Sequence, residues 1–274
     1  MITIASLHVY PVKSCRGVER TDARLTEAGL EHDREWMIVT PQWRFVTQRE
    51  QPRLALIATG LDQQGLNLSA PGAPTVAVPF DFKGDSVQAT VWRDRCNAHD
   101  QGDAVAHWLS DFAGRPLRLV RFDPAHRRPS DTAWTGAVDA VSRFADGFAL
   151  LAISLASLAD LNTRLPAPLP MNRFRPNLVL DGLPPYGEDT VGDLVAGAVR
   201  LRRVKPCARC SITTTNQATG VVDGDEPLRT LKTYRWDAAL RGVTFGQNLI
   251  VVTGDGERVC AGMELRAGDS PVAE

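Results

Sequence analysis

The sequence has little net charge and no long apolar run. Its 274 residues carry a formal net charge of −1, so no overall electrostatic field attracts the chain to nucleic acid or to anionic lipid. The most apolar stretch, residues 148–159, is interrupted by serines and falls short of the roughly 20 residues that span a bilayer. We therefore expect no nucleic-acid partner and no membrane partner, and any anion site must be built locally.

The residue pattern of the sequence also predicts neither a secretory leader nor a disulfide scaffold. The N-terminus, MITIASLHVY, has no basic segment followed by an apolar one, and its alternation predicts a strand. The cysteines are odd in number and widely spaced, at Cys15, Cys96, Cys207, Cys210 and Cys260, unlike the framework of a small secreted protein. We expect a cytoplasmic protein whose thiols are free for packing, metal binding or redox chemistry.

Most of the chain is predicted to form short strands divided by turn residues. The expected strands are residues 2–10, 36–40, 44–48, 54–59, 66–69, 75–80, 87–92, 177–181, 199–204, 211–215, 249–253 and 263–266. Many short strands at close spacing favour antiparallel sheets or a barrel over a βαβ fold. The predicted fold class is mainly β with a few helices (α+β).

Helical spacing of apolar residues appears in only a few places. Asp103 can cap a helix that ends at Gly114, a second helix runs from about residue 157 to the prolines at 166 and 168, and a short third one starts at Pro227. The polar, turn-prone segment 123–129 is interpreted as a domain junction. It divides the chain into a β domain at residues 1–121 and a second β domain at residues 128–270.

The segment Cys207-Ala-Arg-Cys210 carries the most chemical information. Two thiols at this spacing suit metal ligation or dithiol redox work, and Arg209 is expected to favour the thiolate form of Cys210. A structural zinc site needs about four ligands, and the sequence has no second pair of this kind. A thioredoxin-like pair belongs at a strand-to-helix turn, whereas the β-branched residues 211–215 predict a strand. Two ordinary buried cysteines remain an equal alternative.

Several other segments, taken in order along nearly the whole chain, resemble the MOSC superfamily in its branch of amidoxime-reducing components. They are Tyr10-Pro-Val-Lys-Ser-Cys15, Asp33-Arg-Glu-Trp36, Gln51-Pro-Arg-Leu54, Phe144-Ala-Asp-Gly147, Leu155-Ala-Ser-Leu-Ala-Asp-Leu-Asn162, Phe174-Arg-Pro-Asn177, Cys207-Ala-Arg-Cys210 and Phe245-Gly-Gln247. The resemblance implies a MOSC N-terminal β domain, whose first strands can contribute to a cofactor site, packed on a MOSC β-barrel domain. It also brings a looser superfamily association with pyridoxal phosphate binding.

The resemblance implies a molybdenum–molybdopterin cofactor, with Cys210 as the catalytic cysteine and the protein ligand to molybdenum. The cofactor-binding residues that it implies are Lys13, Ser14, Arg34, Asp146, Gly147, Arg175, Asn177, Arg209 and Asn248. Their chemistry suits the group, because guanidinium and ammonium groups match a phosphate and an asparagine can pair with a pterin edge. Cys207 is expected to be structural, and Cys15, Cys96 and Cys260 are expected to be packing residues.

The function that the resemblance implies is the reduction of N-hydroxylated compounds such as amidoximes, hydroxylamines and N-hydroxylated base analogues. Electrons would come from a separate protein of the ferredoxin, flavodoxin or cytochrome type, since a lone late cysteine, Cys260, cannot hold an iron–sulfur cluster. The alternative is a sulfur-transfer protein with a persulfide on Cys210, which does not need Lys13 and the arginines. A ligand-binding β module without enzyme activity is a third interpretation, disfavoured by the lack of four clustered metal ligands.

Overall fold

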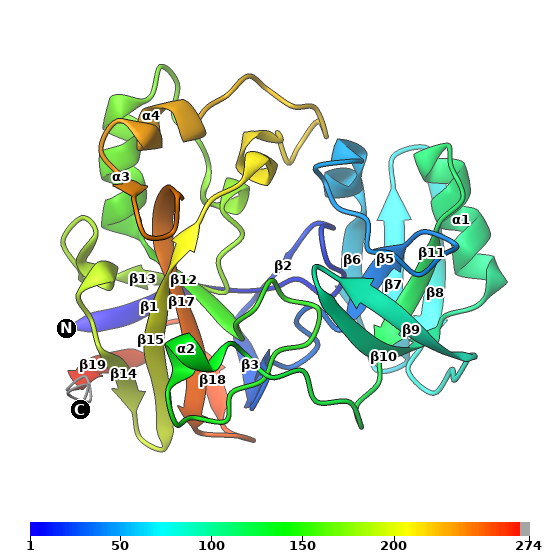
Figure 1. The fold of residues 1–274 in the computed structure, drawn as a ribbon, viewed down its shortest axis with the longest axis horizontal. Helices are drawn as coiled ribbons and strands as arrows, with labels where there is room; N and C mark the ends of the chain where they lie inside the picture. The colour runs from blue at the N-terminus through cyan, green and yellow to red at the C-terminus, as the bar shows by residue number, and fades with distance from the viewer. Residues whose placement is uncertain (269–274) are drawn as a thin grey trace.

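Two groups of strands lie side by side in the molecule (Figure 1). The structure is a computed structural model and describes residues 1–268. In the first group seven strands close into a barrel, because β12 pairs with both β13 and β17. Around the barrel the order is β12 (Leu150–Ser154), β13 (Leu178–Asp181), β1 (Ile2–Val9), β19 (Glu264–Gly268), β14 (Asp193–Ala196), β15 (Val199–Ala208) and β17 (Gly242–Thr253). The predicted mainly β fold with a few helices is confirmed.

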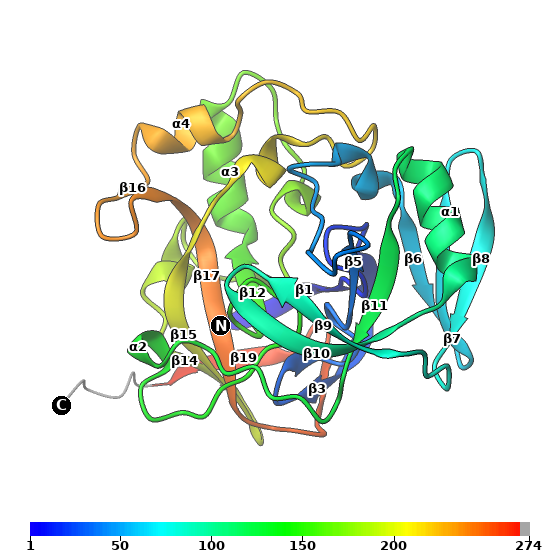
Figure 2. The same cartoon turned by 45° about the vertical axis from the view of Figure 1, so that its right-hand side comes forward.

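The second group, which we call the side domain, combines two small sheets with helix α1 (Asp103–Ala113) (Figure 2). One sheet has the order β5 (Trp36–Val39), β11 (Arg118–Phe122), β10 (Asp94–Asp100) and β9 (Ser86–Val91), and the other has β6 (Ala58–Leu61), β7 (Gly65–Ala70) and β8 (Ala73–Pro79). As its spacing predicts, α1 buries Val105, Trp108, Leu109 and Phe112. These side chains share one apolar cluster with Trp36 from β5.

The first strand of the chain belongs to the barrel. β1 pairs with β13 and β19, and its alternating burial reflects one face turned to the barrel core. Three short strands follow, β2 (Val18–Arg20), β3 (Asp22–Thr26) and β4 (Gly29–Leu30), and β3 pairs with β18 (Arg258–Cys260) near the other end of the chain. The loop between β1 and β2 lies where the two groups meet, because Val12 bridges to Trp36 of β5 and Cys15 is buried in the apolar cluster of the side domain.

The remaining elements are short. They are η1 (Pro52–Leu56), α2 (Thr132–Thr135), α3 (Leu155–Arg164), η2 (Met171–Arg173), η3 (Gly187–Asp189), η4 (Ser211–Thr214), α4 (Leu228–Lys232) and β16 (Trp236–Asp237). In the part of the chain that the structure describes, none of the helices is long and apolar enough to cross a membrane.

The predicted helices exist, but two of their starts differ. Gly102 precedes α1 at the N-cap, so Asp103 is the first helical residue and not the cap. Helix α3 begins slightly earlier than expected, because the Ser154 hydroxyl accepts a hydrogen bond from the Ser157 amide at 3.0 Å and caps it there.

Two of the strands predicted in the side domain are wrong in whole or in part. In 44–48, Arg44 and Phe45 form only isolated bridges to two different strands, so no ladder develops. In 54–59, Pro52 starts the 3-10 helix η1, which leaves only the end of that segment to β6. Strand β10 was not predicted, since its sequence, DRCNAHD, is polar. Its place comes from pairing with β9 and β11.

The strand predicted at residues 211–215 is the 3-10 helix η4 instead. Its threonine hydroxyls hydrogen-bond to nearby backbone carbonyls, from Thr213 to Cys210 at 3.0 Å and from Thr214 to Ser211 at 2.8 Å. Such local bonds offer the backbone an alternative to a sheet ladder, and they override the β preference of threonine. Cys210 therefore follows strand β15 and precedes a helical turn, so strand propensity gives no argument against a redox pair.

Candidate functional site

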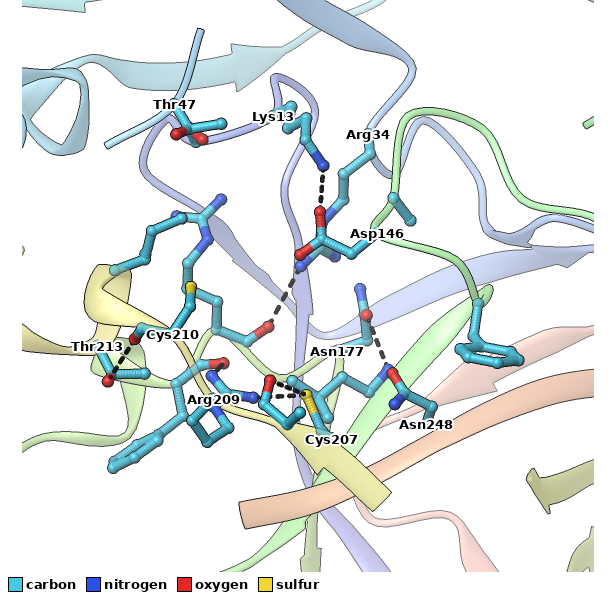
Figure 3. A pocket seen from close by; sticks show the side chains of 18 of the residues that line it. Lys13, Arg34, Thr47, Asp146, Asn177, Cys207, Arg209, Cys210, Thr213 and Asn248 are labelled. Carbon is cyan, nitrogen blue, oxygen red and sulfur yellow. Dashed lines mark hydrogen bonds and ion pairs between the residues drawn. The ribbon is translucent and has the colours of Figure 1, made fainter. Parts of the chain in front are cut away.

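A cavity between the barrel and the side domain collects side chains from both (Figure 3). The cavity is open to solvent, and about 830 Å³ of space free of protein atoms lies in it and at its mouth. The barrel contributes the region of the two cysteines, the start of β12 and part of β17, while the side domain contributes Thr47 and Arg49. The loop after β1 brings Lys13 and Ser14 to the same cavity.

Nearly all of the predicted site residues reach this one cavity. Those that line it are Lys13, Ser14, Arg34, Asp146, Arg175, Asn177, Arg209, Cys210 and Asn248. Gly147 is not among the lining residues, and nothing lies within 4 Å of where its side chain would start. Residues far apart in sequence thus converge at one place, while their individual roles stay predictions.

Lys13 and Asp146 form an ion pair at the cavity wall. Nζ of Lys13 lies 2.5 Å from Oδ1 of Asp146 and donates to the Phe144 carbonyl at 2.7 Å. The Lys13 side chain is 7% exposed, whereas that of Asp146 is 68% exposed because it faces the open cavity. Burial lowers the pKa of Lys13, and the Asp146 carboxylate opposes this. Desolvation works against ionisation of Asp146, but the charge and hydrogen bond of Lys13 hold its pKa well below its usual range.

Arg34 and Arg175 both pack on the buried ring of Tyr10, with their Cζ atoms 4.2 Å and 4.3 Å from its centre. Arg34 also pairs with the Asp33 carboxylate at 2.6 Å, and Arg175 donates to the Cys15 carbonyl at 2.6 Å. Burial lowers the pKa of Arg175 to about 10, so the guanidinium stays charged at neutral pH. The sequence segments predicted to hold a cofactor therefore place two fixed cations against one aromatic ring.

The backbone is strained at three of the lining residues. Ser14, Arg34 and Arg175 have φ values of 70°, 46° and 57°, in the left-handed region that non-glycine residues rarely adopt. Each such residue costs on the order of 1–3 kcal/mol and persists only where the surroundings enforce it. Strain gathered on one cavity supports a functional use of that cavity.

The two cysteines of the motif lie in different surroundings. Arg209 donates to Cys207 Sγ at 2.9 Å and to the Phe174 carbonyl at 2.7 Å, so its guanidinium hydrogen-bonds to these groups and not, as its position in sequence suggested, to the Cys210 sulfur. The guanidinium near Cys210 comes from Arg49, whose Nη1 lies 3.6 Å from Cys210 Sγ. Burial raises the pKa of the Cys207 thiol, which suits a structural role for that residue.

The two asparagines line the cavity but are already occupied. The Asn177 side chain donates to the His8 carbonyl and accepts from the Leu151 amide, each at 3.1 Å, and it is 1% exposed. It therefore ties β1 to β12, and only part of its hydrogen-bonding capacity is left for a ligand. Asn248 donates to the Lys205 carbonyl at 3.2 Å.

The cations of the cavity outnumber its carboxylates. Lys13 pairs with Asp146 and Arg34 with Asp33. Arg49, Arg175 and Arg209 also line the cavity, and among residues 1–268 none of these three forms an ion pair with a carboxylate. The Nε atom of Arg209 is buried and has no hydrogen-bond partner within the described chain. Gathered positive charge of this kind is costly unless an anion balances it, so the charge of the cavity suits an anionic ligand.

Sequence reasoning missed Arg49, which the fold brings to Cys210 across 161 positions of sequence. It lies just after a segment mispredicted as a strand, and nothing in its local sequence distinguishes it from a surface arginine. The CxxC motif at residues 207–210 does not indicate which distant arginine lies beside it either. Only the docking of the side domain on the barrel makes the contact.

Comparison with known proteins matches residues 1–116 to the MOSC N-terminal beta barrel domain and residues 139–272 to the MOSC domain. Mitochondrial amidoxime-reducing component 1 of Homo sapiens is 38% identical over 247 residues, covering 85% of this chain and 72% of the human protein. Mitochondrial amidoxime reducing component 2 of Rattus norvegicus is 35% identical, with the same coverage of 85% and 72%. The component 1 of Xenopus laevis is 32% identical, covering 88% of this chain and 74% of its own length.

Proposed function

Because the chain belongs to the MOSC-domain family that includes the amidoxime-reducing components, we propose that it binds a molybdenum–molybdopterin cofactor in the cavity at Cys210. We propose further that it reduces N-hydroxylated compounds, among them amidoximes, hydroxylamines and N-hydroxylated base analogues. The observation that carries the proposal is a thiol, Cys210, placed beside cations that lack a balancing anion.

The donor set fits the cofactor. Molybdopterin carries a phosphate, and planar guanidinium groups bind phosphate through paired hydrogen bonds. Arg175 and Arg209 each spend part of their donors on backbone carbonyls, which fixes their orientation before a ligand arrives and leaves other N–H groups free. Cys210 supplies a thiol at the cavity wall, the ligand that the family resemblance assigns to molybdenum.

When bound, the cofactor supplies the two-electron redox chemistry that removes oxygen from the substrate nitrogen. The chain's own residues would hold and orient that group: Cys210 would bind the metal, Arg34 and Arg175 would bind the phosphate, and the Lys13–Asp146 pair forms part of the cavity wall. Asp146 is the one of these side chains that is mostly open to the cavity.

A separate protein of the ferredoxin, flavodoxin or cytochrome type would deliver the electrons. Within residues 1–268 no group of three or more His, Cys, Asp or Glu side chains is arranged to hold a metal ion, so the described chain offers no second centre that could relay them. All five cysteines are unpaired, in keeping with a reducing compartment such as the cytoplasm.

The sulfur-transfer alternative has less support. A persulfide carrier needs an accessible thiol, but it does not need charged groups assembled around that thiol at a cost in desolvation and backbone strain. The unbalanced arginines therefore favour a bound anion over a transient sulfur cargo.

The proposal is tested by an N-reduction assay. Protein from a host that makes molybdopterin is mixed with a reduced dye as electron donor and with an aryl amidoxime, and the amidine product is quantified. The wild type should form amidine, and Cys210→Ser should form none above background. Amidine formation by Cys210→Ser at the wild-type rate, or none by molybdenum-loaded wild type, would contradict the proposed function.

A further inference from the structure

Arg49 is the only guanidinium among the cavity-lining residues that hydrogen-bonds to the Cys210 sulfur in the described structure. Its Nη1 atom donates to Sγ at 3.6 Å, within the range for a bond to sulfur. The other candidate, Arg209, spends its donors on Cys207 and on the Phe174 carbonyl. Arg49 comes from the side domain, whereas Cys210 comes from the barrel, so this bond joins the two parts of the molecule at the cavity.

Trp92 holds the Arg49 guanidinium in place. The Arg49 Cζ atom lies 4.5 Å from the centre of the Trp92 ring, a cation–π distance. The ring is itself fixed on two sides: its Nε1 donates to Asp146 Oδ1 at 3.0 Å, and Phe45 packs against it at 5.2 Å. Trp92 is 45% exposed and has a left-handed φ of 56° at the turn between β9 and β10. The left-handed φ is the normal geometry for the first residue of a two-residue hairpin turn, and the half-exposed ring that this turn presents carries the Arg49 guanidinium.

The contacts form a continuous chain around the cavity. It runs from Cys210 to Arg49, from Arg49 to Trp92, from Trp92 to Asp146 and from Asp146 to Lys13. The sulfur of Cys210 thus lies at one end of a network whose other end is the buried ammonium of Lys13. Networks of this kind limit the positions that each member can take.

We propose that Arg49 is a positioning residue that hydrogen-bonds to the sulfur of Cys210 and raises the reduction potential of the metal bound there, with Trp92 holding the guanidinium. The inference rests on the proposed function, since it requires the metal. A hydrogen bond and a positive charge next to a ligating sulfur draw electron density from it. The more electron-poor sulfur donates less to the metal, which makes the reduced metal easier to form.

The test is a redox titration of molybdenum-loaded protein followed by electron paramagnetic resonance of the Mo(V) state. Arg49→Met removes the charge and the donors, Arg49→Lys keeps a charge and N–H donors but loses the planar guanidinium that stacks on Trp92, and Trp92→Ala removes the aromatic ring on which Arg49 packs. Arg53→Met is the matched control, because Arg53 stacks on Phe112 at 4.8 Å and does not line the cavity. Molybdenum per chain is measured in every sample.

We expect Arg49→Met to lower the potential and to change the Mo(V) spectrum, Arg49→Lys and Trp92→Ala to do so less, and Arg53→Met to match the wild type. Equal potentials and spectra in the wild type and Arg49→Met would overturn the inference and leave the proposed function standing. Loss of molybdenum in Arg49→Met, with full loading of Arg53→Met, would also overturn it, because Arg49 would then retain the cofactor instead of tuning it. A wild type without molybdenum would overturn the proposed function and this inference with it.

Discussion

Two cavities of the molecule are rich in arginine, and they differ in how the charge is balanced. The cavity at Cys210 holds arginines without carboxylate partners, as described above. A second cavity, of about 620 Å³, is lined by Glu35, Arg121, Arg127, Arg128 and Arg143. There Arg121 pairs with Glu35 at 2.7 Å, Arg127 with Glu27 at 3.0 Å and Arg128 with Asp94 at 2.7 Å.

The difference between the two cavities is one of degree, since in the second only Arg143 lacks an ion pair with a carboxylate, and its buried Nη1 atom has no hydrogen-bond partner among residues 1–268. In the second cavity the chain supplies most of its own counterions, and Arg128 also donates to the carbonyls of Arg143 and Ala145 at 2.7 Å and 2.6 Å. Its arginines therefore fasten the segment that leads to Asp146. In the cavity at Cys210 the chain leaves cations unbalanced beside a thiol. The two cavities are lined by the same number of arginines. They differ in how many of these arginines form ion pairs with carboxylates.

We expect the largest effect from replacing the Cys210 thiol, compared with the same replacement of Cys207. Cys210→Ser should reduce the molybdenum content of protein from a molybdopterin-producing host to background, because a serine hydroxyl is a poor ligand for a soft metal site. Cys207→Ser should keep most of its molybdenum, since a hydroxyl can still accept the hydrogen bond from Arg209. Molybdenum is measured by mass spectrometry of digested protein. Similar loss in both variants would show that the two thiols act together.

Replacing an arginine that has no carboxylate partner should have the next largest effect, on pterin retention. A charge-assisted hydrogen bond contributes about 1.5–3 kcal/mol, so Arg175→Ala should weaken pterin retention by about 10- to 150-fold. Arg127→Ala, in the second cavity, should leave retention unchanged. Retention is followed as pterin fluorescence after gel filtration and oxidation, with thermal melting as a check on folding. If both variants retained pterin equally, charge balance would not distinguish the cavities.

The ion pairs of the second cavity should affect how the free energy of unfolding depends on pH in the acid range. Burial opposes ionisation of Glu35, but the hydrogen bond and charge of His32 and the charge of Arg121 lower its pKa to about 2 from an ordinary 4.5. A depressed pKa stabilises the fold above the unfolded value, so this stability is present above pH 4.5 and is lost as the pH falls towards 2. It amounts to at most about 3 kcal/mol.

Glu35→Gln should therefore lower the free energy of unfolding at pH 7 and make it less dependent on pH between 4.5 and 2. Urea titrations across this range provide the measurement. Glu27→Gln is the control, because the Glu27 side chain is 58% exposed and exposed ion pairs contribute little. A pH dependence in Glu35→Gln as steep as that of the wild type would contradict this assignment.

The smallest expected effect is that of inorganic phosphate on the melting temperature. Added to cofactor-free protein, it should raise the melting temperature by about 2–5 °C, since an anion that binds only the folded state stabilises it. The increase should disappear in Arg175→Ala and persist in Arg127→Ala. The same increase in both variants would point to general salt effects on the whole chain.

The fold class predicted from the sequence is confirmed, and most of the predicted site residues line one cavity, but the two predictions had different origins. Alternating and helical apolar patterns located β1, β7, β8, β9 and α1, because burial on one face leaves a periodic trace. The site residues came from a family resemblance and not from such patterns. Lys13, Arg34 and Arg175 carry no local sign of convergence, and only barrel closure through β1 brings them together.

What the sequence could not show depends on long-range contacts. The assignment of Arg209 to Cys210 followed from adjacency in the chain, but the side chain turns to Cys207 and Arg49 takes the expected place. The threonines after Cys210 form a helical turn because their hydroxyls bond to nearby carbonyls, which a strand propensity does not include. Charge balance, which separates the two cavities, is a property of pairs that the linear sequence does not reveal.

The most direct test of the central claim is the metal content of wild-type protein purified from a host that makes molybdopterin, with zinc measured in the same sample. The account predicts molybdenum approaching one atom per chain, together with pterin and with little zinc. Protein that carries stoichiometric zinc, or no metal despite a cofactor-replete host, would contradict it.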